Sequence, residues 1–184
     1  MRTEYLLAYH CGPALAGIKT ANIMACLKKE NPEAKEEIKR LNAAMNGRGI
    51  YFEILCECEK RMLIMAYRRE KLCDYLNTPP IKAFLVNCGY PESFSLSVYL
   101  DILRERLREK DFPHEIGAFL GYPIHDIYGF INHKDEGCLL TGEWKVYADA
   151  DGAEKLFCRY RSCRMAILRR LREGKTLEQL FCAA

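Results

Sequence analysis

No apolar run in this 184-residue chain approaches the roughly 20 residues that a membrane-spanning helix needs. The N-terminal stretch, residues 1–9, is short, contains Glu4 and shows no cleavage-site pattern, so we expect no export signal. Internal repeats, low-complexity segments and linkers are also missing. These absences predict one cytoplasmic domain over residues 1–184, without a membrane association.

The chain has little excess charge of either sign. Its 28 Lys and Arg against 25 Asp and Glu give a formal net charge of +3. Proteins that bind nucleic acid usually carry a strongly basic domain or face, so we expect no nucleic-acid partner. Hydrophobic residues make up 49% of the chain, which is enough for a core and excludes a disordered protein.

The ten cysteines include no CxxC pair, the spacing that is typical of zinc and redox motifs. The closest pairs are Cys56 with Cys58, and Cys158 with Cys163. Because no export signal is visible, we expect the thiols to be reduced rather than joined in disulfides. Most of them are then small buried hydrophobic residues.

In the N-terminal half, a short apolar run at residues 5–9 predicts a strand. Gly12-Pro13 then predicts a turn and the start of a helix that continues to Leu27. A second helix is predicted over residues 32–45. Alternating apolar residues at 49–59 and 61–67 predict a β-hairpin.

The C-terminal half reads mainly as helices. An amphipathic helix is predicted over residues 93–109, and a long basic helix over 152–172. Shorter elements are predicted as helices at 70–75, 81–87, 116–120 and 124–131, a strand at 139–147, and a final turn capped by Thr176. Strands and helices do not alternate strictly, so we predict an α+β fold with a small, mainly antiparallel sheet of about four strands packed with several helices.

The first candidate for chemistry is Cys11 at the predicted helix start. A thiol there meets the positive end of the helix dipole and free backbone N–H groups, which favour the thiolate. A cysteine enzyme also needs a base. His114 is the best placed histidine, with Glu115 or Asp126 to orient it, and we expect it within about 8 Å of Cys11. The structural alternative is that Cys11 fills space behind a turn that His10 caps.

Metal binding is a second hypothesis. Neither an HExxH nor a paired CxxC spacing occurs, so no metal site is assigned. Side chains of suitable type are nevertheless present at His10, Cys11, His114, Glu115, His125, Asp126 and His133. The alternative is that the histidines lie on the surface near helix ends.

The segment from Cys11 to Ala16 resembles the cysteine motif of the bacteriocin-processing C39 peptidases, which share the papain fold. The stretch from His114 to Tyr122 is similar to the histidine strand of that group. This resemblance implies a papain-like arrangement with Cys11 as nucleophile. The chain departs from the motif at His10, where an acidic residue is usual, and at Glu115, which replaces an apolar residue.

A second resemblance covers nearly the whole chain. Its landmarks are residues 10–19 (HCGPALAGIK), residues 112–123 (FPHEIGAFLGYP), Asp126, residues 129–131 and residues 142–147. Together they resemble an uncharacterised bacterial family found mainly in Clostridia and other anaerobic Firmicutes. Members are often encoded near flavodoxins and iron-uptake genes, which implies a link to redox or metal metabolism. Within these landmarks, His10, Lys19 and Tyr122 are candidate binding residues.

The basic helix at residues 152–172 is the third candidate. Leu156, Tyr160 and Cys163 recur at helical spacing and are predicted to be buried. Arg161 and Arg169 then belong to an exposed basic stripe, which would complement an acidic partner such as a flavodoxin. The alternative is that these arginines only solvate the helix.

Two functions therefore remain open from the sequence. The first is a cytosolic protein whose Cys/His pocket performs thiol-based chemistry, as a hydrolase, a transferase or a redox protein. The second is a non-enzymatic binding protein that associates with a metal or a flavodoxin. The sequence assigns no cofactor and no oligomeric state.

Overall fold

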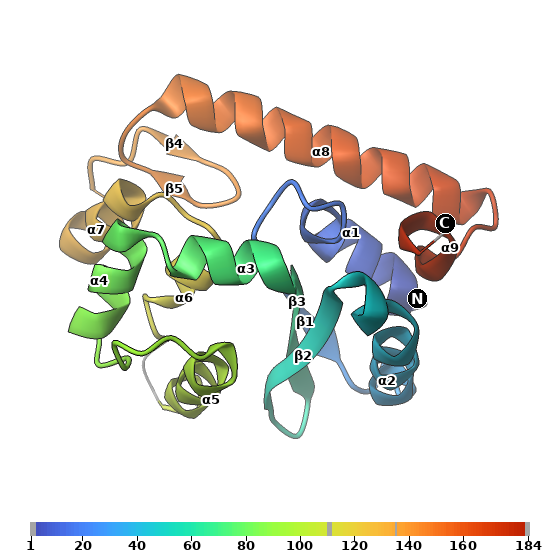
Figure 1. Cartoon of the computed structure of the whole chain (residues 1–184). Helices are drawn as coiled ribbons and strands as arrows, with labels where there is room; N and C mark the ends of the chain where they lie inside the picture. The colour runs from blue at the N-terminus through green and yellow to red at the C-terminus, as the bar shows by residue number, and fades with distance from the viewer. Residues whose placement is uncertain (1–2, 110–111, 135, 183–184) are drawn as a thin grey trace.

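The computed structural model describes residues 3–109, 112–134 and 136–182. At its centre lies an antiparallel sheet of β1 (Ala21–Leu27), β2 (Ile50–Glu57) and β3 (Arg61–Arg68), with β3 in the middle. Strands β2 and β3 form the predicted hairpin. Figure 1 shows the sheet between two groups of helices.

Alternation along the strands gives the sheet two buried faces. On β3, Ile64 and Ala66 enter one core cluster, whereas Met65 and Tyr67 enter another. Successive side chains of a strand point to opposite faces, so each strand contributes to both clusters. The sheet therefore separates two cores, one on each of its faces.

The first core lies under α1 (Thr3–Leu15), α2 (Ala34–Met45), the C-terminal part of α8 (Ala150–Arg172) and α9 (Leu177–Phe181). A 3-10 turn, η1 (Asn46–Arg48), connects α2 to β2. Helices α1 and α8 pack closely at Gly12, where an added Cβ would lie 3.0 Å from Ile167 Cδ1. Gly12 is therefore a contact point between helices rather than the turn that we predicted.

The second core lies under five shorter helices on the other face of the sheet. They are α3 (Arg69–Leu76), α4 (Pro79–Asn87), α5 (Leu96–Arg106), α6 (Ile116–Phe119) and α7 (Ile124–His133). Its largest side chains are aromatic, among them Phe84, Tyr99 and Phe119. These five helices lie to the left of the sheet in Figure 1.

A small third cluster joins the two layers. The ladder of β4 (Leu140–Thr141) and β5 (Lys145–Val146) packs against the N-terminal half of α8 through Trp144, Val146 and Phe157. Asp149 begins α8 by accepting a 3.1 Å hydrogen bond from Gly152 N. This N-cap stabilises the helix start by about 1 kcal/mol.

The predicted α+β class is confirmed, with a three-stranded sheet and a two-stranded ladder in the described residues. The hairpin, α2 and the helices between residues 69 and 133 lie close to their predicted ranges. The final helix has the predicted Thr176 cap, completed by Gln179 in a capping box. The predicted strand at 139–147 is two short strands around a loop.

The predicted order of the N-terminal elements is wrong. Residues 5–9 belong to α1, and residues 21–27 form β1 rather than a helix. Leu7, Cys11 and Leu15 recur at a spacing of four and bury one helical face, which a five-residue apolar run did not reveal. Pro13 lies in the last turn of α1, where it donates no hydrogen bond to Tyr9 O and the helix ends two residues later.

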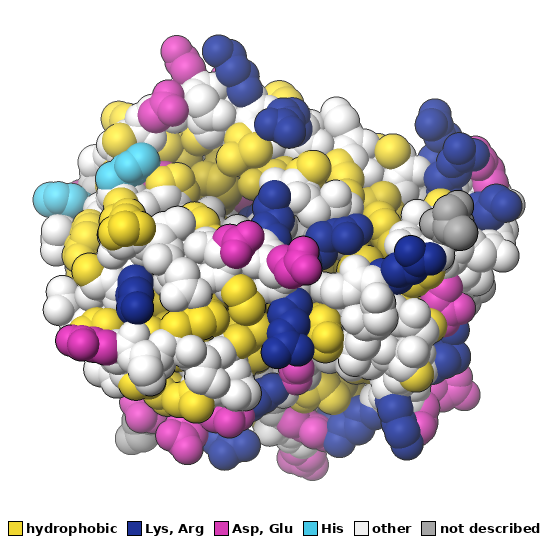
Figure 2. Space-filling model, viewed as in Figure 1, with side chains coloured by type: hydrophobic (Ala, Val, Ile, Leu, Met, Phe, Trp, Pro, Cys, Tyr) yellow, Lys and Arg dark blue, Asp and Glu magenta, His cyan; other side chains and the backbone are white. Residues whose placement is uncertain are grey.

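No helix within the described residues is both long and apolar enough to cross a membrane. The longest, α8, buries Tyr160 and half-buries Leu156 and Cys163, as predicted. Its outer face carries Arg161 and Arg169, which are exposed. Figure 2 shows Lys and Arg side chains gathered over the C-terminal end of α8.

Candidate functional site

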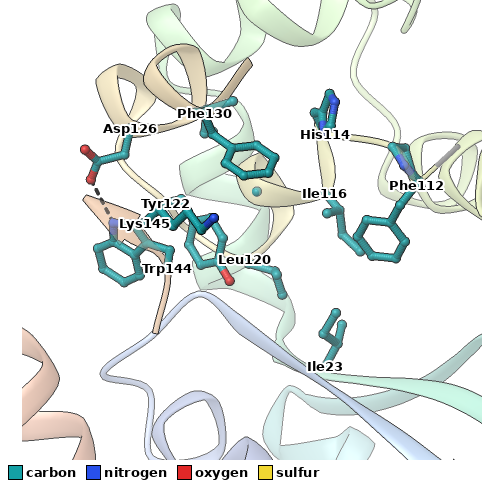
Figure 3. A pocket seen from close by; sticks show the side chains of 13 residues that line it. Ile23, Phe112, His114, Ile116, Leu120, Tyr122, Asp126, Phe130, Trp144 and Lys145 are labelled. Atoms are coloured by element: carbon teal, nitrogen blue, oxygen red, sulfur yellow. Dashed lines mark hydrogen bonds between the residues drawn. The ribbon is translucent and has the colours of Figure 1, made fainter. Parts of the chain in front are cut away.

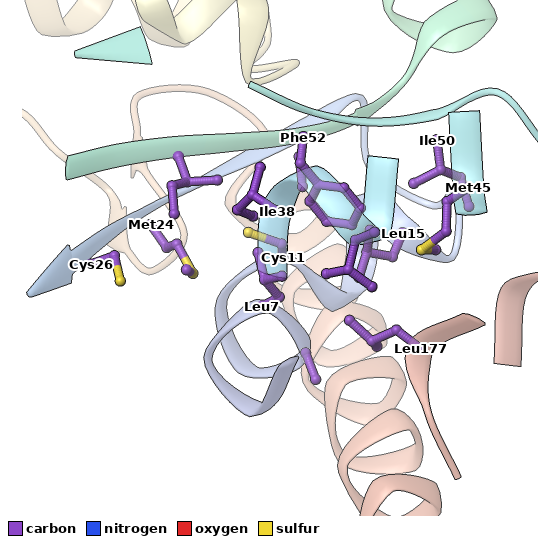
Figure 4. Packing of buried hydrophobic residues seen from close by; sticks show 14 of the residues in the cluster. Leu7, Cys11, Leu15, Met24, Cys26, Ile38, Met45, Ile50, Phe52 and Leu177 are labelled. Carbon is purple, nitrogen blue, oxygen red and sulfur yellow. The ribbon is translucent and has the colours of Figure 1, made fainter. Parts of the chain in front are cut away.

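Cys11 lies in the middle of α1 and not at a helix start, so that prediction is wrong. Its side chain is 0% exposed and packs in the first core, between Leu7 and Ile38 in Figure 4. Burial raises the pKa of the thiol to about 12, against smaller opposing effects of Lys19 and Arg164. The helix N–H groups that would favour a thiolate are already used within the helix. Cys11 is therefore a protonated, enclosed thiol.

The predicted partners of Cys11 lie on the other face of the sheet. His114 is exposed in the turn before α6, with its ring edge-on to Phe130 at 5.4 Å between centroids. Glu115 is buried and forms a 2.5 Å ion pair with Arg106. The sheet and its two cores separate Cys11 from His114, so the predicted dyad and the papain-like arrangement are not formed.

The candidate metal ligands are also dispersed. Over residues 3–109, 112–134 and 136–182, no group of three or more His, Cys, Asp or Glu side chains converges as a metal site would require. His125 approaches Asp126 at 3.6 Å, but its neighbours in the fold supply no third ligand.

An apolar pocket of about 300 Å³ opens on the second face of the sheet. Figure 3 shows Trp144, Tyr122 and Lys145 on one side of it and Phe112, His114 and Ile116 on the other, with Ile23 of β1 below. Gly117 forms part of the wall, and an added Cβ there would lie 3.1 Å from the Tyr122 ring. The pocket thus depends on a residue without a side chain.

Asp126 holds one wall of this pocket. Its carboxylate accepts 2.7 Å hydrogen bonds from Trp144 Nε1 and from Tyr147 N, and a third bond of 3.3 Å from Ala148 N. These bonds fix the loop after β5 against α7. The buried carboxylate therefore orients Trp144, and none of these bonds connects it to His114.

A polar cleft adjoins the apolar pocket. Both cavities are lined by Ile23, Leu120 and Tyr122, so the Tyr122 ring forms a shared wall. The remaining side chains that line the cleft are mostly polar and come from α1, the loop after it, β1, the β4–β5 loop and α8. They are Tyr9, His10, Lys19, Asn22, Glu143 and Arg164.

Local structure brings Lys19 to this junction. Helix α1 ends at Leu15, and Gly17 with its φ of +73° then lets the chain reverse. Pro13 O accepts hydrogen bonds from Ile18 N and Lys19 N. The next residue, Thr20, meets the turn at Gly121, where a Cβ would lie only 2.3 Å from Thr20 Oγ1. Two glycines thus permit the loop with Lys19 to approach the turn with Tyr122.

The Lys19 side chain is only 3% exposed, yet it lines the cleft. Its Nζ lies 3.9 Å from Glu143 Oε2, 5.3 Å from the Tyr122 ring centroid and 5.8 Å from that of Tyr160. Within the described part of the chain, Nζ has these contacts but no hydrogen bond shorter than 3.5 Å. Burial lowers the pKa of Lys19 to about 8, although Glu143 acts in the opposite direction.

Arg164 completes the charge pattern of the cleft. Its Nη2 donates a 2.9 Å hydrogen bond to Glu143 Oε1, and its guanidinium lies over the Tyr9 ring. Its Nε is buried without a hydrogen-bond partner among the described residues. Burial and the charge of Arg164 lower the pKa of His10 at the rim. With His10 neutral, the two cations Lys19 and Arg164 face the single carboxylate of Glu143. The cleft therefore has one excess positive charge.

Three predicted binding residues, His10, Lys19 and Tyr122, therefore lie in one cleft. Arg161 and Arg169 do not line it. Sequence reasoning missed the roles of Glu143 and Arg164, although Glu143 stands beside the single tryptophan. Trp144 is 7% exposed and both packs in the third cluster and lines the pocket.

The fold and cavities define an α+β protein with a two-part pocket beside the edge strand β1. The chain belongs to the family described as Protein of unknown function (DUF3793), whose model matches residues 7–181. This confirms the prediction of a family without an assigned function. No curated protein and no solved structure matches the chain significantly.

Proposed function

We propose that this protein binds a small organic molecule with an apolar body and an oxygen-bearing group. The apolar body occupies the pocket beside Trp144, and the oxygen atoms face Lys19. The observation that carries this proposal is the Lys19 side chain, which is 3% exposed and lines a cleft at the boundary with an apolar pocket, with its ammonium group 3.9 Å from Glu143 Oε2. A buried cation of this kind is costly unless a partner satisfies its donors.

The size and lining of the pocket agree with a small ligand. About 300 Å³ is at the lower end of the range for ligand pockets, which suits a single ring or a short chain. Each Å² of apolar surface removed from water contributes about 25 cal/mol, so the apolar part supplies affinity. Lys19 and Arg164 then supply orientation.

The charge of the cleft selects the polar group. With an excess of one positive charge, the cleft favours a carboxylate or a carbonyl oxygen over an ammonium group. Glu143 disfavours a doubly charged anion, because its carboxylate lies among the donors. We therefore expect monoanions and neutral carbonyl compounds to bind and cations to be rejected.

The emission of Trp144 tests this proposal, because it is the chain's single tryptophan and lines the pocket. Benzoate should change the emission in a saturable way, toluene more weakly, and benzylamine least. The Lys19→Met variant should lose the preference for benzoate over toluene, whereas Lys155→Met, on the exposed face of α8, should keep it. Equal responses to benzoate and benzylamine would overturn the proposal.

The basic face of α8 supports a second candidate function, docking of an acidic protein such as a flavodoxin in bacterial redox or iron metabolism. Arg161, Arg169 and Arg172 are all exposed on one helix, and their charges are not used in the ligand cleft. Thiol-based chemistry at Cys11 has no comparable support, because the thiol is enclosed. The ten free cysteines agree with a cytoplasmic location.

A further inference from the structure

We propose that Lys19 forms a reversible imine with an aldehyde whose apolar body occupies the pocket beside Trp144. This inference rests on the proposed ligand site and adds covalent chemistry to it. It names the oxygen-bearing group as a carbonyl and the ligand class as small apolar or aromatic aldehydes.

The position of Nζ supports this reaction. The two aromatic rings of Tyr122 and Tyr160 and the Glu143 carboxylate hold the ammonium group at the shared wall of the two cavities. Ile23, Leu120 and Tyr122 line both cavities, so a carbonyl group at this boundary would lie next to the cleft, where Nζ is a nucleophilic nitrogen. Such positioning raises the effective concentration of the carbonyl at the amine.

The environment also supplies the reactive protonation state. Imine formation requires the neutral amine, and a pKa of about 8 leaves roughly a tenth of Lys19 neutral near pH 7. The groups that face Nζ and set this balance are Glu143, which favours the charged form, and Arg164, which disfavours it. Cys11 contributes no charge in its protonated state, and the hydroxyls of Tyr122 and Tyr160 stay protonated because burial raises the pKa of each to about 12.

The reaction balances without a further reactant. The neutral Nζ attacks the carbonyl carbon, the C–N bond forms, and the carbonyl oxygen takes a proton to give a carbinolamine. The hydroxyl then leaves as water with the second proton of the nitrogen, and a C=N double bond remains. Water reverses the reaction, and neither step involves oxidation or reduction.

Reductive trapping tests this inference. The full chain is incubated with benzaldehyde and cyanoborohydride, and peptide mass spectrometry locates the benzyl group. We expect Lys19 to be modified first, and the initial rate to rise with pH around a midpoint near 8. The Lys19→Arg variant should lose this rapid modification. Lys155→Arg, on the exposed face of α8 and outside both cavities, should retain it.

Benzoate distinguishes failure of this inference from failure of the proposed ligand site. Benzoate should protect Lys19 from trapping and leave exposed lysines such as Lys155 reactive. Modification spread evenly over the exposed lysines, with Lys19 unmodified, would overturn the imine. If Lys19 stayed unmodified but benzoate still changed Trp144 emission, the ligand site would stand without the covalent step. If benzoate also left Trp144 emission unchanged, both proposals would fail.

Discussion

The two faces of the central sheet differ in how completely they are covered. On one face, α1, α2, α8 and α9 enclose a core in which Leu7, Cys11 and Leu41 are 0% exposed. On the other face, five short helices leave an apolar pocket of about 300 Å³ beside the edge strand β1.

This comparison assigns different tasks to the two faces. The closed face supplies stability, because its side chains lose all contact with water. The open face supplies the candidate ligand site, because its glycines and turns bring distant side chains together around a space. The sequence predicted thiol chemistry at Cys11. The structure places Cys11 inside the closed face, where a substrate cannot reach it.

The largest expected difference between the faces is in thiol reactivity. Cys58 is exposed, and backbone N–H groups of Arg61 and Lys60 lower the pKa of its thiol. Cys11 can react only after the core opens, which costs at least about 5 kcal/mol. We therefore expect Cys58 to react with iodoacetamide at least a thousand times faster than Cys11. Peptide mass spectrometry after short labelling measures both rates.

A matched variant makes the labelling result specific. Cys58→Ser should remove the fast reaction and leave Cys11 unlabelled until urea unfolds the chain. Rapid labelling of Cys11 in the folded protein, below the usual thiol pKa, would show that the first face is not closed and would restore the thiol hypothesis.

The second expected effect concerns the wall of the apolar pocket on the open face. Asp126→Ala removes the acceptor for the indole N–H of Trp144 and the backbone N–H groups of Tyr147 and Ala148. Buried donors without partners are costly, so the free energy of unfolding should fall by about 3 kcal/mol. Urea denaturation measures it, and the Trp144 emission should shift to the red as the loop loosens.

Asp101→Ala is the control for this prediction, because Asp101 is exposed on α5 and, among the residues that the structure describes, pairs only with Arg104. Its unfolding free energy should change by less than about 0.5 kcal/mol. If both variants unfolded alike and Trp144 emission stayed constant, Asp126 would not position the pocket wall.

Local patterns in the sequence explain why much of the fold was predictable. The hairpin at β2 and β3 shows an alternation of period two, and α5 and α8 show apolar residues at helical spacing. The apolar run at residues 5–9 is too short for its spacing to distinguish a helix from a strand. Ile23 and Leu27 are spaced by four, which suggested a helix, but burial along β1 alternates over Met24, Ala25 and Cys26.

The candidate site was predictable only in part. His10, Lys19 and Tyr122 were identified as binding candidates, but nothing in their spacing showed that they meet Glu143 and Arg164. Such contacts depend on tertiary packing, here on how closely Gly121 approaches Thr20. The dyad of Cys11 and His114 failed for the same reason, because the sheet that separates them is not visible in a local pattern.

The third expected effect is a pH dependence carried by Lys19. Its folded-state pKa of about 8 is lower than the usual 10.5, so between these values the unfolded chain holds a proton that the folded chain has released. Stability therefore rises with pH across this window. We expect wild type to gain about 2 kcal/mol over Lys19→Met between about pH 7.5 and pH 9.5.

Comparison with the Lys19→Met variant is essential, because other groups titrate in the same range. Burial raises the pKa of Cys11 and Tyr122, which lowers stability as pH rises, but these groups are present in both proteins. Urea unfolding at several pH values gives the difference directly. A difference that stays constant with pH would mean that Lys19 is not desolvated in the folded protein.

The smallest expected effect concerns the outer surface of the closed face. Arg161 and Arg169 are exposed on α8, and the nearest contact of Arg161 is with the sulfur of Cys158. If this surface binds an acidic protein such as a flavodoxin, exposed charge pairs act over about 8 Å at physiological salt, so association should slow as ionic strength rises. Arg161→Glu with Arg169→Glu should lower the association rate constant several-fold and leave the dissociation rate nearly unchanged. Stopped-flow or surface plasmon resonance measures both. Lys71→Glu with Lys82→Glu, on α3 and α4 of the open face, is the charge-matched control and should have little effect. Equal effects of the control and the double variant would show that only net charge matters, and binding indifferent to salt would remove this face of α8 as the docking surface.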